Sequence, residues 1–122
     1  MNTVSQEQKA TAPSKLSPTM EQYVSIKEQY PDALLFYRMG DFFELFFDDA
    51  KIAAKELQLA LTSRNPKYPS PISMCGMPYH AVEEHLRRLL DKGYKYLQYD
   101  VQYRLYLHLS FYHLIFSFLY VF

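Results

Sequence analysis

Apolar residues recur along this chain with two spacings, which separate helical from extended segments. Three segments carry apolar residues three or four positions apart, the spacing of one helix face: 18–30, 49–58 and 79–92. Shorter apolar or alternating runs between Gly, Pro and Asp breaks are typical of strands: 33–39, 42–47, 59–63 and 72–77. Helices that alternate with short strands predict the α/β fold class, with a small mixed β-sheet flanked by helices.

Several helix ends carry a local signal. Ser17 followed by Pro18 is typical of a helix start, with the hydroxyl as the cap. Asp48 and Asp49 are expected to cap the second helix at the positive end of its dipole, and Pro78 is expected to begin the third. The core-facing positions predict six buried side chains: Phe36, Phe43, Leu45, Leu57, Leu86 and Leu89.

The strand expected at 42–47 combines aromatic residues with one carboxylate. Alternation divides it into two faces: Phe43, Leu45 and Phe47, which is wholly apolar, and Phe42, Glu44 and Phe46. Because an ionised Glu44 is costly to bury without a partner, we expect the end with Phe42 and Glu44 to face outward. An exposed ring beside a hydrogen-bond acceptor can serve recognition. The alternative is a half-buried edge strand with a solvated Glu44.

Composition limits the classes of function. The 122 residues suffice for one domain and one modest core. With 13 basic and 13 acidic residues the net charge is zero, which argues against nucleic-acid binding through bulk positive charge. The single cysteine, Cys75, excludes an internal disulfide and fits a reducing cytosol. Neither Cys75 nor His80 has a partner at metal-ligand spacing, so we expect no metal site and no catalytic residue.

Four blocks of sequence are similar to one known family: TMEQY at 19–23, LFYRMGDFFELF at 35–46, DDAK at 48–51 and GMPYHAVE at 76–83. They closely resemble the N-terminal mismatch-recognition domain, domain I, of the bacterial MutS family of DNA mismatch repair proteins. The second block is highly specific, and the four together cover roughly residues 17–95. The resemblance implies the small mixed α/β fold of that domain.

The resemblance also implies a function and its residues. The family's Phe-x-Glu motif falls on Phe42 and Glu44, which implies that Phe42 stacks on a mispaired base and that Glu44 accepts a hydrogen bond from it. Met39, Arg64 and Lys67 are candidate contacts to the DNA backbone. For Arg64 and Lys67 the alternative is a pair of solvated loop cations.

Partners and cofactors follow from the same resemblance. The family binds double-stranded DNA with mismatches or small loops, forms a MutS homodimer, acts with MutL, and uses ATP and magnesium in the full-length protein. No Gly-x-x-x-x-Gly-Lys-Ser/Thr motif occurs in the 122 residues, so we expect no ATP site, no cofactor and no enzymatic activity in this chain. The polar first eight residues do not resemble a secretory signal, which favours a cytoplasmic location.

The chain is expected to divide into a disordered leader at 1–16, a MutS-like domain at 17–95 and a divergent aromatic and apolar tail at 96–122, with residues from 94 onward completing the sheet imperfectly. Residues 105–122 form a run of 18 uncharged residues. This composition indicates a truncated or frameshifted product, which would be non-functional. The alternative is a membrane anchor, since about 17–25 apolar residues span a bilayer. His108 and His113 argue against it, and membrane association is not expected.

Overall fold

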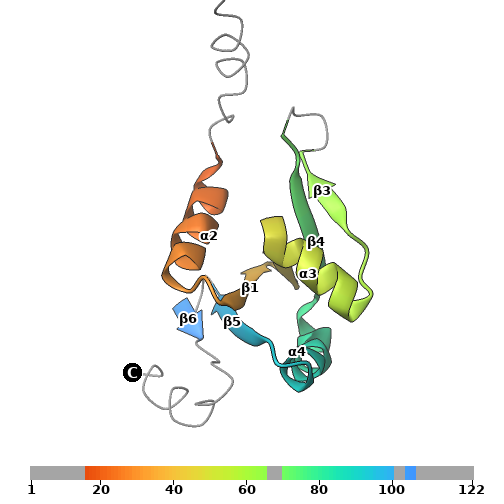
Figure 1. Cartoon of the computed structure of the whole chain (residues 1–122). Coiled ribbons are helices and arrows are strands. Elements are labelled where there is room, and N and C mark those ends of the chain that lie inside the picture. Colours follow the sequence, from red (N-terminus) through yellow and green to blue (C-terminus); the bar gives the residue numbers. More distant parts are fainter. Residues whose placement is uncertain (1–15, 66–69, 101–103, 107–122) are drawn as a thin grey trace, which may run out of the picture.

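A six-stranded mixed sheet forms the centre of the computed structural model, which describes residues 16–65, 70–100 and 104–106 (Figure 1). Its strands are β1 (Ala33–Met39), β2 (Phe42–Phe46), β3 (Thr62–Arg64), β4 (Ile72–Pro78), β5 (Lys95–Asp100) and β6 (Arg104–Tyr106). Their order across the sheet is β3-β4-β2-β1-β5-β6. β1 and β5 are parallel and all the other neighbouring strands are antiparallel, which confirms the predicted mixed sheet.

Helices cover both faces of this sheet: α2 (Pro18–Gln29), α3 (Phe47–Leu57), the 3-10 helix η1 (Tyr79–Ala81) and α4 (Val82–Asp91). α2 packs on one face, where its buried side chains Met20, Tyr23 and Ile26 join a core cluster with Leu35 and Phe46. α3 and α4 pack on the opposite face and enclose a second cluster. The six side chains expected to be buried all lie in that second cluster: Phe36, Phe43, Leu45, Leu57, Leu86 and Leu89.

The start of α2 follows the predicted signal. The Ser17 hydroxyl accepts a hydrogen bond from the backbone N–H of Met20 at 3.3 Å, and Pro18 is the first helical residue. The helix ends at Gln29, one residue before the expected end, and Pro31 follows two residues later. Proline disfavours a helical conformation in the residue before it, which explains this end.

Three expected boundaries are wrong. β2 ends at Phe46 and α3 begins at Phe47, whose φ of 57° turns the chain out of the sheet, so Phe47 is not a strand residue. Pro78 does not begin a helix but closes β4, which runs unbroken through Gly76. The short strand expected at 59–63 is β3, at Thr62–Arg64, because its register is set by pairing with β4.

The end of the sheet also differs from expectation. β5 pairs with β1 over six consecutive residues, from Ala33 opposite Lys95 to Arg38 opposite Asp100. β5 also buries the side chains of Tyr96 and Leu97. The segment that follows residue 94 therefore completes the sheet, with the regular pairing to β1 just described. The sheet therefore continues past residue 95, the expected end of the domain.

Some expectations fall outside the described residues. These are the leader at 1–15, the loop residue Lys67 and the apolar run at 107–122. Within the described ranges, no helix is both long and apolar enough to cross a membrane.

Candidate functional site

The β1–β2 hairpin carries the candidate site at its turn. Gly40 in this turn has a φ of 61°, a conformation that glycine adopts without strain. Across the hairpin, Met39 pairs with Phe42 and Tyr37 pairs with Glu44. Directly opposite residues project from the same face of a sheet. Met39, Phe42 and Glu44 therefore share one face.

Exposure changes sharply along β2. Phe42 is 47% exposed, whereas Phe43 is 7% and Leu45 is 0% exposed, which confirms the expected core face for these two residues; Phe47, expected on the same face, packs instead against the α2 cluster. Phe46 lies on the same face as Phe42 but is fully buried, because α2 covers that end of the strand. The Tyr23 ring meets the Phe46 ring edge-on, with 5.0 Å between the ring centroids. The expectation of an outward-facing end is thus confirmed for the part of β2 near Phe42.

Glu44 is half-buried beside the exposed ring. Burial raises the pKa of its carboxyl group, and the positive charge of Arg64 opposes that rise. The residue opposite Glu44 in β4 is Gly76, so a glycine rather than a side chain lies next to the carboxyl-bearing stem. Glu44 is therefore less readily ionised than a fully solvated glutamate.

Arg64 reaches the same surface from a distant part of the chain. Its guanidinium carbon lies 5.8 Å from the centroid of the Phe46 ring, and its Nη1 donates to the Met39 sulfur at 3.9 Å. Together with its electrostatic effect on Glu44, these contacts place Arg64 over the end of the face that carries Phe42. The structure thus brings together four of the five predicted site residues; Lys67 lies outside the described residues.

Two neighbours of this site were not predicted. Arg38 lies on the opposite face, where its guanidinium carbon is 4.4 Å from the centroid of the Tyr79 ring and its Nη1 is 3.3 Å from an Asp100 carboxylate oxygen. Tyr79 is 45% exposed, and its backbone N–H donates to the Asp41 carbonyl at 2.7 Å. Tyr79 therefore lies beside the turn that leads to Phe42. Its place in the GMPYHAVE block was the available signal, but the sequence does not show which turn it meets.

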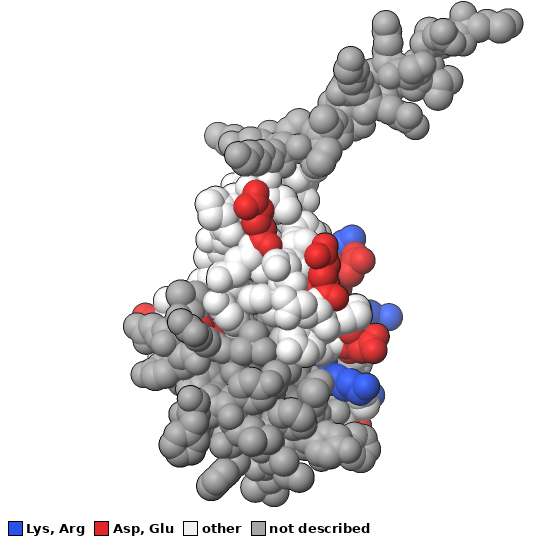
Figure 2. All heavy atoms as spheres, turned by 90° about the vertical axis from the view of Figure 1, so that its left-hand side faces the viewer, with Lys and Arg blue, Asp and Glu red and all other residues white. Residues whose placement is uncertain are grey.

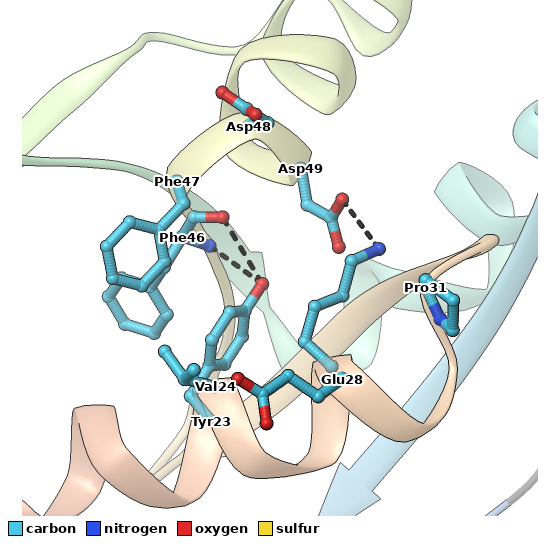
Figure 3. Close-up of a pocket in the computed structure, with 9 residues that line it drawn as sticks. Tyr23, Val24, Glu28, Pro31, Phe46, Phe47, Asp48 and Asp49 are labelled. Carbon is cyan, nitrogen blue, oxygen red and sulfur yellow. Dashed lines mark hydrogen bonds and ion pairs between the residues drawn. The ribbon is translucent and has the colours of Figure 1, made fainter.

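Hydrogen bonds anchor the other end of β2 to α2 (Figure 3). The Tyr23 hydroxyl accepts from the Phe46 backbone N–H at 3.1 Å and lies 3.3 Å from the Phe46 carbonyl, to which it can donate. Nearby, Lys27 Nζ lies 3.0 Å from an Asp49 carboxylate oxygen and donates to the Ala33 carbonyl at 2.6 Å. These contacts join α2, β1 and the β2–α3 junction, so they fix the strand on which Phe42 and Glu44 stand.

Asp48 and Asp49 do not cap α3 as expected. Both lie in its first turn, but the N-cap residue is Phe46 and has no side-chain capping bond. Asp49 is instead 5% exposed and accepts a hydrogen bond from the Leu35 backbone N–H at 2.9 Å. Burial raises the pKa of Asp49, while this hydrogen bond and the Lys27 charge oppose the rise. This role of Asp49 depends on contacts of α3 with β1 and α2, which the sequence does not show.

A mainly apolar pocket of about 310 Å³ lies between α2 and the start of α3. Val24, Pro31, Phe46 and Phe47 line its apolar part (Figure 3). Lys27 and Asp49, which form an ion pair, also line the pocket. Phe42 is not among the lining residues, so the candidate site is an open surface and not this pocket.

Charge is mixed on the α2 side of the molecule. Among the residues described there, acidic side chains lie at the top of an uncharged area, and acidic and basic side chains lie near one another along its right-hand edge (Figure 2). In the same described part of the chain, no group of three or more His, Cys, Asp or Glu residues is placed to hold a metal ion. Cys75 is buried, and its thiol donates to the Ala50 carbonyl at 3.4 Å.

The exposed Phe42 ring and the half-buried Glu44 carboxyl group on one strand face suit stacking and directional hydrogen bonding.

Comparison with known proteins places the chain in a family. The family model for MutS domain I matches residues 17–102. The DNA mismatch repair protein MutS of Nitratidesulfovibrio vulgaris strain DP4 is 66% identical over 86 residues, which are 70% of this chain and 10% of that protein. The proteins of the same name from Lawsonia intracellularis and Streptococcus pneumoniae strain Hungary19A-6 are 59% and 56% identical over 81 residues, 66% of this chain.

The alignments cover about two thirds of this chain but only a small part of each relative. The chain spans about a tenth of the length of the curated relatives it matches. The family model, by contrast, covers most of the chain and includes every strand from β1 to β5. The match therefore spans helices α2 to α4 and strands β1 to β5, and this chain belongs to the MutS family through its domain I.

Proposed function

We propose that this chain is the mismatched-DNA recognition module of a MutS-type mismatch repair protein. Phe42 enters the duplex at the mispair and stacks on a mispaired base, and Glu44 forms a hydrogen bond with the displaced base. The observation that carries the proposal is the exposure of Phe42 on the same strand face as Glu44. The other two aromatic side chains of β2, Phe43 and Phe46, are buried. One ring of β2 is thus presented to a ligand and its neighbours hold the strand.

The physics of the duplex supports a wedge of this kind. Inserting an apolar side chain between base pairs costs a few kcal/mol of unstacking and kinks the DNA. A mispaired step is already less well stacked and paired, so the same insertion costs less there. The protein then distinguishes sites by their deformability instead of by base identity. One ring can therefore recognise many different mismatches.

Glu44 adds discrimination by a different route. A carboxylate among phosphates is repelled, which weakens binding to any duplex, whereas the hydrogen bond forms only where a base edge is displaced. Burial already raises the pKa of Glu44 in the free protein. Nearby phosphates would raise this pKa further, so protonation in the complex relieves part of the repulsion.

Met39 and Arg64 lie where they can support the same contact. Arg64 supplies a cation on the face that carries Phe42, and its guanidinium already lies near Met39. A guanidinium suits a phosphate oxygen because it offers several donors in a fixed plane. We assign Lys67 to the same backbone contacts from its place in the sequence between β3 and β4.

Other parts of the activity need a longer protein. We propose that ATP and magnesium binding, homodimer formation and interaction with MutL belong to regions of the full-length relatives that this chain does not span. The chain alone should bind DNA weakly and without dependence on ATP, since stacking on one ring supplies only about 1–3 kcal/mol.

The test compares duplexes that differ by one mispair. Binding isotherms are measured at one salt concentration for the 122-residue chain and for residues 17–102 placed in the full-length Nitratidesulfovibrio vulgaris protein. The full-length chimera should prefer the mismatched duplex. Phe42→Ala should remove that preference and leave weak, salt-dependent binding to any duplex. Ile52→Ala is the matched control, because Ile52 is also an exposed apolar residue but lies on α3. A mismatch preference that survives in Phe42→Ala would refute the proposal.

A further inference from the structure

Gly76 is a glycine that its own backbone does not require. Gly40 and Gly93 have positive φ values of 61° and 88°, a conformation that favours glycine. The φ angle of Gly76 is not positive, so its backbone conformation is open to other residues. Gly76 lies within β4, where a residue without a side chain weakens a strand. A glycine in a strand interior often marks a close approach by another group. The neighbour that makes this approach is therefore the feature to identify.

That neighbour is Glu44 together with the β2 backbone. Gly76 lies directly opposite Glu44 in the antiparallel β2–β4 pair. A Cβ atom at position 76 would lie 3.1 Å from Glu44 Cγ and 2.9 Å from the Phe43 carbonyl oxygen. Both distances are shorter than ordinary van der Waals contacts, so the space that a side chain would need is already filled. The Phe43 carbonyl oxygen and the stem of Glu44 together occupy that space.

We propose that Gly76 is a positioning residue for Glu44, whose side chain lies across β4 only because position 76 has no side chain. The inference rests on the proposed function, since it matters for DNA only if Glu44 contacts the displaced base. With any other residue at 76, the stem of Glu44 must turn away from β4 and the β2 backbone at Phe43 must shift. The carboxyl group would then stand at a different height relative to the Phe42 ring.

The surroundings of Glu44 are consistent with a fixed carboxyl group. The Arg64 guanidinium is the charged group that acts on Glu44, and the Cys75 thiol next to Gly76 is affected by Glu44 in turn. The Glu44 side chain, whose stem lies beside Gly76, is also partly removed from water. A carboxyl group that turned away from β4 would regain water and ionise more readily.

The first test needs no DNA. In the 122-residue chain, nuclear magnetic resonance should detect a contact between the Glu44 γ protons and the Gly76 α protons, and a titration should give the pKa of the Glu44 carboxyl group. Gly76→Ala should shift this pKa downward, toward that of a solvated glutamate. Met74→Ala is the matched control, because it perturbs β4 on the same face without adding an atom beside Glu44. Its Glu44 titration should match that of the parent chain.

The second test asks whether Gly76 acts through Glu44. The ratio of mismatched to matched affinity is measured in the full-length chimera for the parent sequence, Gly76→Ala, Glu44→Ala and the double variant. Gly76→Ala should lower the ratio toward the Glu44→Ala value, and the double variant should show no further loss. A loss in Gly76→Ala that is equally large with and without Glu44 would overturn the inference.

The outcomes separate the two proposals. If neither the parent chimera nor its Glu44→Ala variant shows a mismatch effect, the proposed function fails, and the resonance test still decides the positioning role. If Glu44→Ala lowers the ratio but Gly76→Ala does not, the positioning role alone fails. If Gly76→Ala does not fold, the Glu44–Gly76 proton contact in the parent chain decides, and its absence overturns the inference.

Discussion

The hydroxyl of Tyr23 binds the backbone of Phe46, with the Phe46 N–H donating to it at 3.1 Å. Tyr23 lies on α2 and Phe46 is the last residue of β2, so this bond holds the strand end under the helix. The same strand emerges from beneath α2 four residues earlier, at Phe42. β2 is therefore fixed at its buried end by the Tyr23–Phe46 hydrogen bond and exposes the Phe42 ring at its other end.

This anchor predicts a stability cost for Tyr23→Phe. The variant keeps the ring but leaves the buried Phe46 N–H without this acceptor, which should lower the free energy of unfolding by about 1–3 kcal/mol. Urea denaturation of the 122-residue chain measures the change. Tyr94→Phe, which removes a hydroxyl from a partly buried ring against the other core cluster, is the control. An equal loss in both variants would contradict the specific role of the Tyr23 hydroxyl.

Lys27→Met should destabilise the protein in a pH-dependent way. Asp49 is buried and its pKa is already raised by desolvation, so loss of the Lys27 charge raises that pKa further. The native state then binds a proton more tightly than the unfolded state. The deficit should therefore be largest at neutral pH and shrink as the pH falls and Asp49 becomes protonated. At neutral pH it should stay below the roughly 3–5 kcal/mol of a fully buried pair.

The matched control for this prediction is Lys51→Met. Lys51 pairs with Asp48 at 3.6 Å, but both side chains are largely exposed, and exposed ion pairs contribute little to stability. Unfolding curves at several pH values should therefore be nearly unchanged in this variant. A Lys27→Met deficit that is independent of pH would mean that packing, and not the charge on Asp49, explains the loss.

Glu44→Gln should stabilise the fold at neutral pH. The native pKa of Glu44 is raised above its unfolded value, so the carboxyl contributes most to stability at low pH, and that contribution is lost as the pH rises through the native pKa. A neutral amide of the same shape avoids this loss. The gain should be a fraction of a kcal/mol, because the side chain is partly exposed. It should vanish at a pH below the ordinary glutamate pKa, and Glu83→Gln on exposed α4 surface should show no such gain.

Glu44→Ala should change DNA binding in a way that distinguishes recognition from support. Removing a repelled charge should hold or raise the affinity for matched DNA, while the ratio of mismatched to matched affinity falls. Glu44→Gln should fall between the parent and Glu44→Ala, since it keeps an acceptor and loses the charge. Paired isotherms in the full-length chimera measure both quantities.

The control for this binding prediction is Asp41→Ala. Asp41 is an exposed carboxylate in the turn between β1 and β2. Its removal should raise the affinities for matched and mismatched DNA together and leave their ratio unchanged. If Glu44→Ala lowered the matched and mismatched affinities equally, Glu44 would be a structural support and the proposed discrimination would be wrong.

The sequence by itself determined the local features of this protein. The alternation along β2 was enough to place Phe43 in the core and Phe42 outside, because successive side chains in a strand point to opposite faces. Ser17 followed by Pro18 was enough to predict the start of α2. Each of these features depends on residues that are a few positions apart in the sequence.

Only the tertiary structure decided which distant residues meet. The burial of Phe46 depends on α2, and the contacts of Arg64 with the Phe42 face depend on the placement of β3 next to β4. The pairing of Glu44 with Gly76 depends on the β2–β4 register. Strand order and register are set by how both core clusters pack around the sheet. No spacing in the sequence contains that information, because it arises from contacts between residues far apart along the chain.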